Sequence, residues 1–139
     1  MKLIRLWRVG PKDIFEIASN HFQIQEVRQA IMKGIVKVIS GICGMLTEVR
    51  ATSDDQAGTV KLEFNTRCEN IQKLAGELTE VNPYEEISFR GAGPRTLRMA
   101  AKHCQHAACP VPSGIIKAIE VASGLALPKD AVIEVKKEN

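Results

Sequence analysis

Two stretches of alternating polar and apolar residues, separated by a short polar segment, constrain the fold of this chain most strongly. They cover residues 45–52 and 59–65. Each places apolar side chains on one face and polar side chains on the other, as a β-strand with one buried face does. The residues between them, 53–58, are rich in turn formers. The pattern therefore predicts an antiparallel hairpin that packs on a core.

The apolar faces of this hairpin also predict its register. If Thr52 lies opposite Thr59, the apolar side chains of the two strands oppose each other and the buried face stays continuous. Continued beyond the strands, the same register places Cys43 opposite Cys68. We therefore expect these two thiols at the open end of the hairpin, near enough to share a ligand.

The remaining elements follow from periodicity and from Gly and Pro positions. In chain order we expect a strand over 34–39, a helix just after Cys68, a helix over 95–103, a helix from Cys109 to about 123, and a final strand over 131–136 with Ile133 and Val135 inward. Together with the hairpin, these elements predict an α+β fold. Its sheet is mostly antiparallel and has three to four strands, with two to three helices packed on one face.

Bulk properties limit the classes of function. The chain has 139 residues, which suits one domain, and a net charge of +3, too small to indicate binding to nucleic acid or to an anionic membrane. No apolar run approaches the roughly 20 residues that a membrane-spanning helix needs. The first residues mix charged and apolar side chains, unlike a secretory signal. We therefore expect a cytoplasmic protein in a reducing compartment.

The N-terminal part differs from the rest in composition and in the pattern of its apolar residues. We divide the chain into an N-terminal extension, 1–31, and a single α+β domain, 32–139. The extension contains the only Trp of the chain, and a clean strand pattern begins only after it. One interpretation is that Met32 is the native start and that the extension is a translated leader. The alternative is an amphipathic helix that begins after Pro11.

The four cysteines carry the sharpest functional hypothesis. Cys68 and Cys109 each precede a predicted helix, Cys43 lies between two glycines, and Cys104 ends a helix. The N-terminus of a helix favours the thiolate that binds a metal. Soft sulfur ligands suit zinc, which we favour, or an iron–sulfur cluster. We therefore predict a metal site of these four cysteines, with cysteines that only fill the core as the plain alternative.

A second class of function is a redox or nucleophilic enzyme. Its candidate nucleophile is Cys109, with His106 three residues earlier as the base. Catalytic Cys–His pairs are generally distant in sequence, so this pattern is a weak signal.

A third class is an interaction module that docks on a larger enzyme. A protein partner and self-association into a homo-oligomer both stay open, and no other cofactor is indicated.

Four segments of the domain resemble an uncharacterised family of small, cysteine-containing prokaryotic proteins, a domain of unknown function. The segments are 41–44 (Gly-Ile-Cys-Gly), 68–75 around the second cysteine, 104–112 with the last two cysteines, and 124–128 (Gly-Leu-Ala-Leu-Pro). They cover most of residues 32–139. This resemblance implies no established activity.

The layout is also similar to the TSCPD domain, which occurs alone or at the end of some ribonucleotide reductases. Those domains place one cysteine before a hairpin, one before a helix, and a Cys-Pro segment before the last helix. That resemblance implies that Cys43, Cys68, Cys104 and Cys109 are metal-type cysteines. It also implies docking on a larger enzyme.

Overall fold

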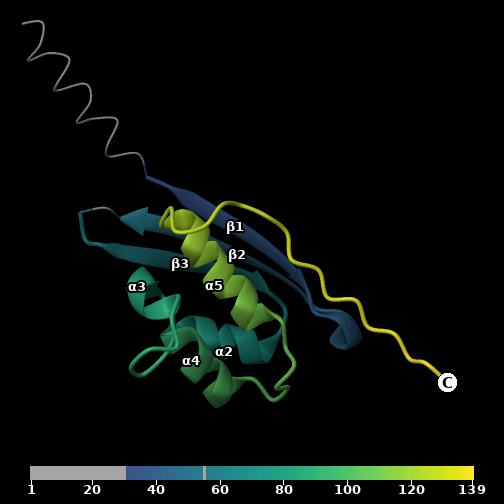
Figure 1. Ribbon diagram of the computed structural model, residues 1–139. Helices are drawn as coiled ribbons and strands as arrows, with labels where there is room; N and C mark the ends of the chain where they lie inside the picture. Colours follow the sequence, from purple (N-terminus) through teal and green to yellow (C-terminus); the bar gives the residue numbers. More distant parts are fainter. Residues whose placement is uncertain (1–30, 55) are drawn as a thin grey trace, which may run out of the picture. The chain divides into compact units, whose positions relative to one another are not determined.

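One antiparallel sheet organises the protein (Figure 1), in a computed structural model that describes residues 31–54 and 56–139. Its strands are β1 (Lys33–Ile39), β2 (Leu46–Asp54), β3 (Thr59–Thr66) and β4 (Glu80–Val81), hydrogen-bonded in the order β1-β2-β3-β4. A short 3-10 turn, η1 (Gly41–Cys43), joins β1 to β2. The three strands predicted first are confirmed, whereas β4 has no clear sequence signal because it is only two residues long.

The helices pack on the sheet and on each other. They are α2 (Glu69–Glu77), α3 (Pro83–Glu86), α4 (Arg95–His103) and α5 (Val111–Ala122). Helix α5 lies across β1 and β2, α2 packs on β3, and α4 packs on α2 (Figure 1). The α+β fold predicted from the sequence is confirmed. No helix in the described part of the chain combines the length and the hydrophobicity needed to cross a membrane.

The core lies between this helical layer and one face of the sheet. Side chains of β2 alternate between buried and accessible along the strand, so one face of β2 is buried throughout. Among the fully buried side chains, most of the largest apolar ones come from α2, including its C-cap, and from α5, and the others come from β2 and β3: Ile71, Leu74, Leu78, Val111, Ile115, Ile119, Val49 and Val60. Removing each large apolar side chain from water contributes about 1.5–3 kcal/mol.

The predicted register of the central hairpin is wrong by two residues. Asp54, not Thr52, lies opposite Thr59. The reason is a tighter turn: the Asp54 carboxylate accepts hydrogen bonds from the backbone N–H groups of Gln56 and Ala57, both at 3.1 Å, so β2 runs on to Asp54 before the chain turns. Since a shift of two residues leaves every side chain on its original face, the apolar pattern alone could not detect it.

The predicted final strand is also wrong. Residues 131–136 form no strand, and Ile133 and Val135, expected to face inward, are exposed. An alternating apolar pattern forms a strand only when a neighbouring strand satisfies its backbone, and none does so here. The helix expected after Pro11, the leader hypothesis and the role of the N-terminal extension fall on residues outside the described ones, apart from Ile31.

Helix α5 approaches the sheet closely because two glycines face the contact. A Cβ atom at Gly34 in β1 would lie 2.3 Å from the Ala118 carbonyl oxygen of α5. A Cβ atom at Gly114 in α5 would lie 2.5 Å from Val38 Cγ2 of β1. Both distances are shorter than van der Waals contact. Side-chain atoms at these two positions would therefore push the helix away from the strand.

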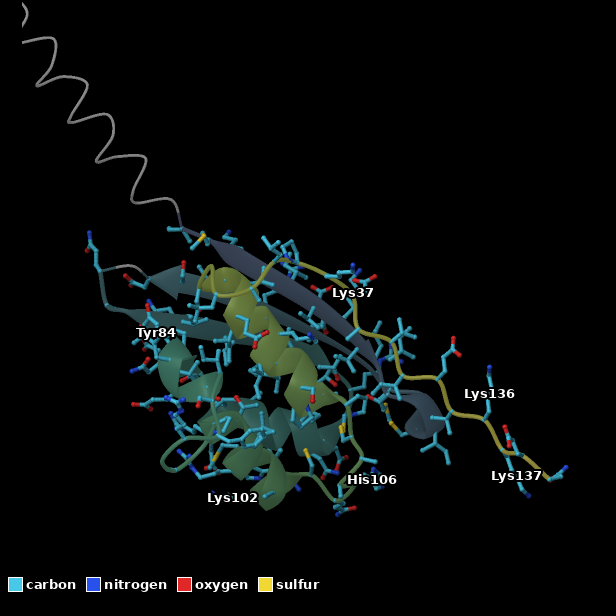
Figure 2. All side chains as sticks on the ribbon, in the orientation of Figure 1. Lys37, Tyr84, Lys102, His106, Lys136 and Lys137 are labelled. Atoms are coloured by element: carbon cyan, nitrogen blue, oxygen red, sulfur yellow. The ribbon has the colours of Figure 1, made fainter. Side chains whose placement is uncertain are left out.

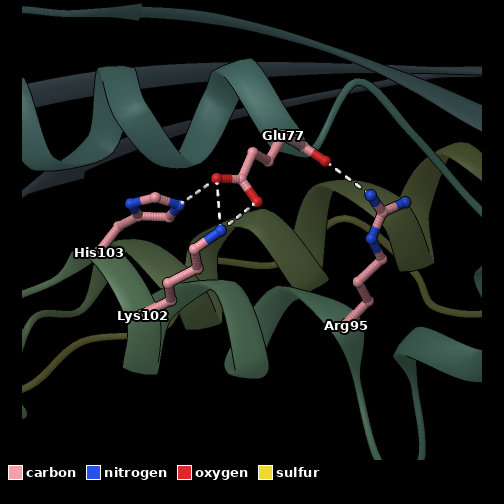
Figure 3. A network of polar contacts seen from close by, with 4 residues as sticks. All are labelled: Glu77, Arg95, Lys102 and His103. Atoms are coloured by element: carbon pink, nitrogen blue, oxygen red, sulfur yellow. Dashed lines mark hydrogen bonds and ion pairs between the residues drawn. The ribbon is translucent and has the colours of Figure 1, made fainter.

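A hydrogen-bonded network ties α2 to α4 (Figure 3). The Glu77 carboxylate of α2 accepts hydrogen bonds from Lys102 Nζ at 2.7 and 2.8 Å, and its Oε1 lies 2.9 Å from His103 Nε2. Arg95, at the start of α4, donates from Nη2 to the Glu77 carbonyl oxygen at 2.7 Å. Glu77, the last residue of α2, thus contacts both the start and the end of α4 and holds the two helices together.

We expect Gly34→Ala to destabilise the protein, because the new methyl group overlaps a backbone atom that cannot rotate away. Overpacking of this kind costs about 1–3 kcal/mol of unfolding free energy. The matched control is Gly76→Ala in α2, where a Cβ atom meets nothing within 4 Å and Ala favours the helix by about 0.5–1 kcal/mol. Urea denaturation measures both. Equal stability of Gly34→Ala and the wild type would contradict the close contact.

We expect the stabilising effect of Glu77 to depend on pH. The hydrogen bond from Lys102, and then that with His103, hold the pKa of Glu77 below its usual value of 4.5 despite partial desolvation. A carboxylate with a lowered folded-state pKa stabilises the fold above its unfolded pKa and loses this effect as pH falls through the folded pKa. Glu77→Gln should therefore lower the melting temperature near neutral pH and have little effect in acid.

The control for this comparison is Glu85→Gln in α3. The Glu85 side chain is exposed and forms no ion pair among the described residues. The melting temperature of this variant should follow the wild type at every pH. A constant difference between Glu77→Gln and the wild type from neutral pH to about pH 3 would show that the carboxylate charge is irrelevant.

Candidate thiol site

Three of the four predicted cysteines lie at the ends of helices, against the core. Cys68 is the N-cap of α2, Cys104 is the C-cap of α4, and Cys109 directly precedes Pro110, the N-cap of α5. All three side chains are half-buried and pack against the hydrophobic core. The predicted helix boundaries around these cysteines are confirmed.

The packing of α4 on α2 brings Cys68 and Cys104 near each other. The Cys68 thiol lies close enough to the Cys104 thiol to raise its pKa. Cys68 lies at the start of α2 and Cys104 at the end of α4. The chain then returns from α4 to α5 through a loop of a few residues, which brings Cys109 to the same region.

The electrostatics of Cys104 reflect its neighbours. Burial raises the pKa of the Cys104 thiol most, and the nearby thiols of Cys109 and Cys68 raise it further. Of these two thiols, Cys109 has the larger effect. Thiols from two other positions of the chain therefore lie close to Cys104 and favour its protonated form.

Backbone hydrogen bonds fix the three cysteines at these positions. The Cys68 N–H donates to the Thr66 hydroxyl at 3.2 Å, the Cys104 N–H donates to the Ala100 carbonyl at 2.8 Å, and the Cys109 N–H donates to the His106 carbonyl at 3.1 Å. The main chain of the site is thus set by ordinary helix-terminal bonds.

Cys43 does not join this group. It lies in η1, its side chain is exposed, and its thiol lies 3.9 Å from the Ser40 carbonyl oxygen. It is not among the thiols that raise the pKa of Cys104. The expected meeting of Cys43 and Cys68 rested on the hairpin register that proved wrong, and the turn at η1 directs the chain back into β2.

The histidines near the thiols have different surroundings. His103 is engaged with Glu77 (Figure 3). His106 is exposed in the loop after α4 (Figure 2), and no hydrogen bond joins its ring to a cysteine within residues 31–54 and 56–139. The hypothesis that His106 acts as a base for Cys109 stays a prediction.

The thiols are not preset in the geometry of a metal centre. Among the residues that the structure describes, no group of three or more His, Cys, Asp or Glu side chains is arranged to hold a metal ion. The two surface hollows of this part of the chain lie elsewhere: one on the accessible face of the sheet around Arg50 and Glu63, the other around Tyr84 and Arg98. Neither hollow is lined by a cysteine.

One buried carboxylate had no sequence signal. Glu86 is 1% exposed, and its two oxygens accept hydrogen bonds from the backbone N–H groups of Arg95, at 3.0 Å, and Thr96, at 2.9 Å. It therefore caps the N-terminus of α4 from a distance of nine residues. Such a contact depends on the fold of the intervening loop, and local sequence does not predict it.

Comparisons with known proteins place the chain in a family. No curated protein and no solved structure matches it. One family model matches residues 32–135, which is more than half of the chain. The resemblance of the domain to an uncharacterised family is thereby confirmed, whereas its similarity to the TSCPD domain stays a prediction. The chain belongs to the Family of unknown function (DUF6951).

Proposed function

We propose that this protein binds a thiophilic metal ion through Cys68, Cys104 and Cys109. The observation that carries the proposal is that the thiols of Cys68 and Cys109 lie close enough to the Cys104 thiol to raise its pKa, and that all three pack at helix ends against the core. Half-buried side chains at the rim of a core are more constrained than surface thiols. Their convergence is hard to explain by packing alone, because any small apolar residue would fill the same space.

The chemistry of the three thiols favours a soft ion. Sulfur ligands suit zinc, which we favour, or an iron–sulfur cluster. The metal binds thiolates, so it must displace protons from the site. The raised pKa of Cys104 makes this displacement costly in acid and easier as pH rises. Binding is therefore expected to strengthen with increasing pH.

The geometry of the helix ends allows the site to close around an ion. The backbone of each cysteine is held by a hydrogen bond, so binding requires rotation of the three side chains without refolding. Three protein ligands leave one position of a tetrahedral zinc site open. That position can be filled by water, by a substrate, or by His106 from the loop between Cys104 and Cys109.

We also propose a cytoplasmic location, because the four cysteines form no disulfide with one another in this structure. Free thiols persist in a reducing compartment, where cysteine clusters more often serve metals or catalysis than disulfides. We therefore place the metal-binding function in the cytoplasm.

Cobalt(II) titration of the reduced full-length protein tests the proposal. We expect intense thiolate-to-cobalt absorption in the wild type and its loss in Cys104→Ser, since serine removes a soft ligand with little change in size. The matched control is Cys43→Ser, which removes an exposed thiol outside the group and should bind cobalt like the wild type. Absence of thiolate absorption in the wild type, or its loss in Cys43→Ser and not in Cys104→Ser, would refute the proposal.

A second candidate function rests on the closeness of the Cys104 and Cys109 thiols, of which Cys109 raises the pKa of Cys104. Two neighbouring thiols can form a disulfide by transferring two electrons and two protons to an oxidant such as an external disulfide. In this reading Cys109 is the attacking thiol and Cys104 resolves the mixed disulfide. The protein would then be a redox enzyme rather than a metal carrier.

Equilibration with reduced and oxidised glutathione, followed by alkylation and peptide mass analysis, distinguishes the two functions. A redox pair predicts a specific Cys104–Cys109 disulfide that forms at cellular glutathione ratios and involves neither Cys43 nor Cys68. If all four thiols stay reduced under these conditions, or if glutathionylation occurs only at exposed Cys43, the redox function is excluded.

A further inference from the structure

The first strand of the sheet has an open edge. β1 pairs with β2 along its whole length, from Lys33 opposite Thr52 to Ile39 opposite Leu46. Within the described ranges no strand pairs with its other side, because β1 is the first strand in the sheet order. A long edge strand presents a row of free N–H and C=O groups and is a template for pairing with another strand.

The C-terminal tail, 127–139, begins near this edge. Gly124 lies next to Met32, at the start of β1, since a Cβ atom on Gly124 would lie 3.1 Å from Met32 Cε. From there the tail runs extended along the side of β1 (Figure 1). Its side chains stand out from the body (Figure 2), where the labelled Lys136 and Lys137 mark its course. It contains no helix or strand.

The tail exposes apolar side chains that suit a strand. Leu127, Val132, Ile133 and Val135 are between 78% and 89% exposed. Three of the four are β-branched, the type most favoured in strands. A run of exposed apolar residues this dense is typical of a surface that a partner covers. Residues 131–136 therefore have the composition of a strand, but their backbone is not paired with one.

The apolar side chains of the tail and of β1 match in a parallel register. With Glu134 set beside Lys37, Ile133 falls beside Val36 and Val135 beside Val38. Val36 and Val38 lie on the face of β1 that packs against α5. In this arrangement the apolar side chains of the tail would extend the core by one strand.

The charges match in the same register. On the opposite face of β1, Glu134 falls beside Lys37 and Asp130 falls beside Lys33. Each pair joins opposite charges across neighbouring strands, which favours the pairing. Lys33 and Lys37 are the charged side chains that protect this edge against unspecific pairing. A strand that neutralises both of them is therefore selected over an arbitrary apolar segment.

We propose that two copies of this chain exchange their C-terminal tails, so that residues 131–136 of each copy form a fifth strand on β1 of the other. The tail of one chain passes its own β1 without joining it: among the described residues, its backbone hydrogen bonds end at Ala126. Exchange pairs β1 of both copies by the same twofold operation, so the contact closes on two chains. Addition of a strand to an open edge is a common mode of recognition.

The mass of the full-length protein in solution tests the exchange. Sedimentation equilibrium should give a dimer for the wild type and a single chain for Ile133→Asp/Val135→Asp, because charged side chains cannot extend the core. The control is Phe89→Asp, which alters an equally exposed apolar side chain in the loop before α4 and should remain dimeric. Circular dichroism and thermal melting confirm that each variant is folded.

A charge exchange provides the second measurement. Lys37→Glu and Glu134→Lys should each weaken the dimer, and the double variant should restore it. Lys37 also lies 3.8 Å from Glu48, so the decisive result is the restoration by the double variant rather than the effect of either single change. A monomeric wild type, or a dimer that survives Ile133→Asp/Val135→Asp, would overturn the exchange. If the wild type is monomeric and Ile133→Asp/Val135→Asp unfolds more easily, the tail pairs with β1 of its own chain instead.

Discussion

The close contact between α5 and β1 is the constraint on which the rest of this structure depends. Gly34 and Gly114 remove side-chain atoms from both sides, so the backbone of the helix approaches the backbone of the strand. At this distance the apolar face of α5 reaches β2 as well as β1. The buried side chains Ile115 and Ile119 then fill the centre of the core. A longer helix–sheet distance would leave a cavity, and cavities destabilise in proportion to their volume.

The position of α5 also determines where the thiols lie. Cys109 is held at the N-terminal end of this helix, and the short loop before it leads from Cys104 at the end of α4. Helix α4 is in turn fixed on α2 by Glu77 and Arg95. Cys68 starts α2 and so completes the group. The thiol site is therefore a consequence of how these helices pack on one another.

The sequence predicts the helices and strands that local periodicity determines. It does not predict features that depend on contacts between residues distant in the sequence. The 3.6-residue stripe of α4 identified its bounds, and the alternation of β3 identified that strand. The register of β2 and β3 was missed because Asp54 tightens the turn through backbone hydrogen bonds, while the apolar faces tolerate a shift of two. The tail was wrongly predicted to be a strand of the same sheet. Its alternating apolar residues indicate that it can pair as a strand, but they do not identify the strand with which it pairs. The expected meeting of Cys43 with Cys68 extrapolated the wrong register through a turn, and the metal-binding role of the four cysteines stays a prediction.

The two proposed properties occupy opposite ends of one helix. α5 begins next to Cys109 and ends at Ala122, shortly before the tail departs, and its 12 residues span about 18 Å. The core between these ends is closely packed, and the tail would pair with an edge that none of the three grouped cysteines touches. Metal binding would turn side chains whose backbones stay fixed, so it transmits little to the sheet edge. Coupling between distant sites requires an element with two arrangements, and α5, locked on β1 by two glycines, offers only one. The thiol site and the sheet edge are therefore expected to act as independent units of one fold.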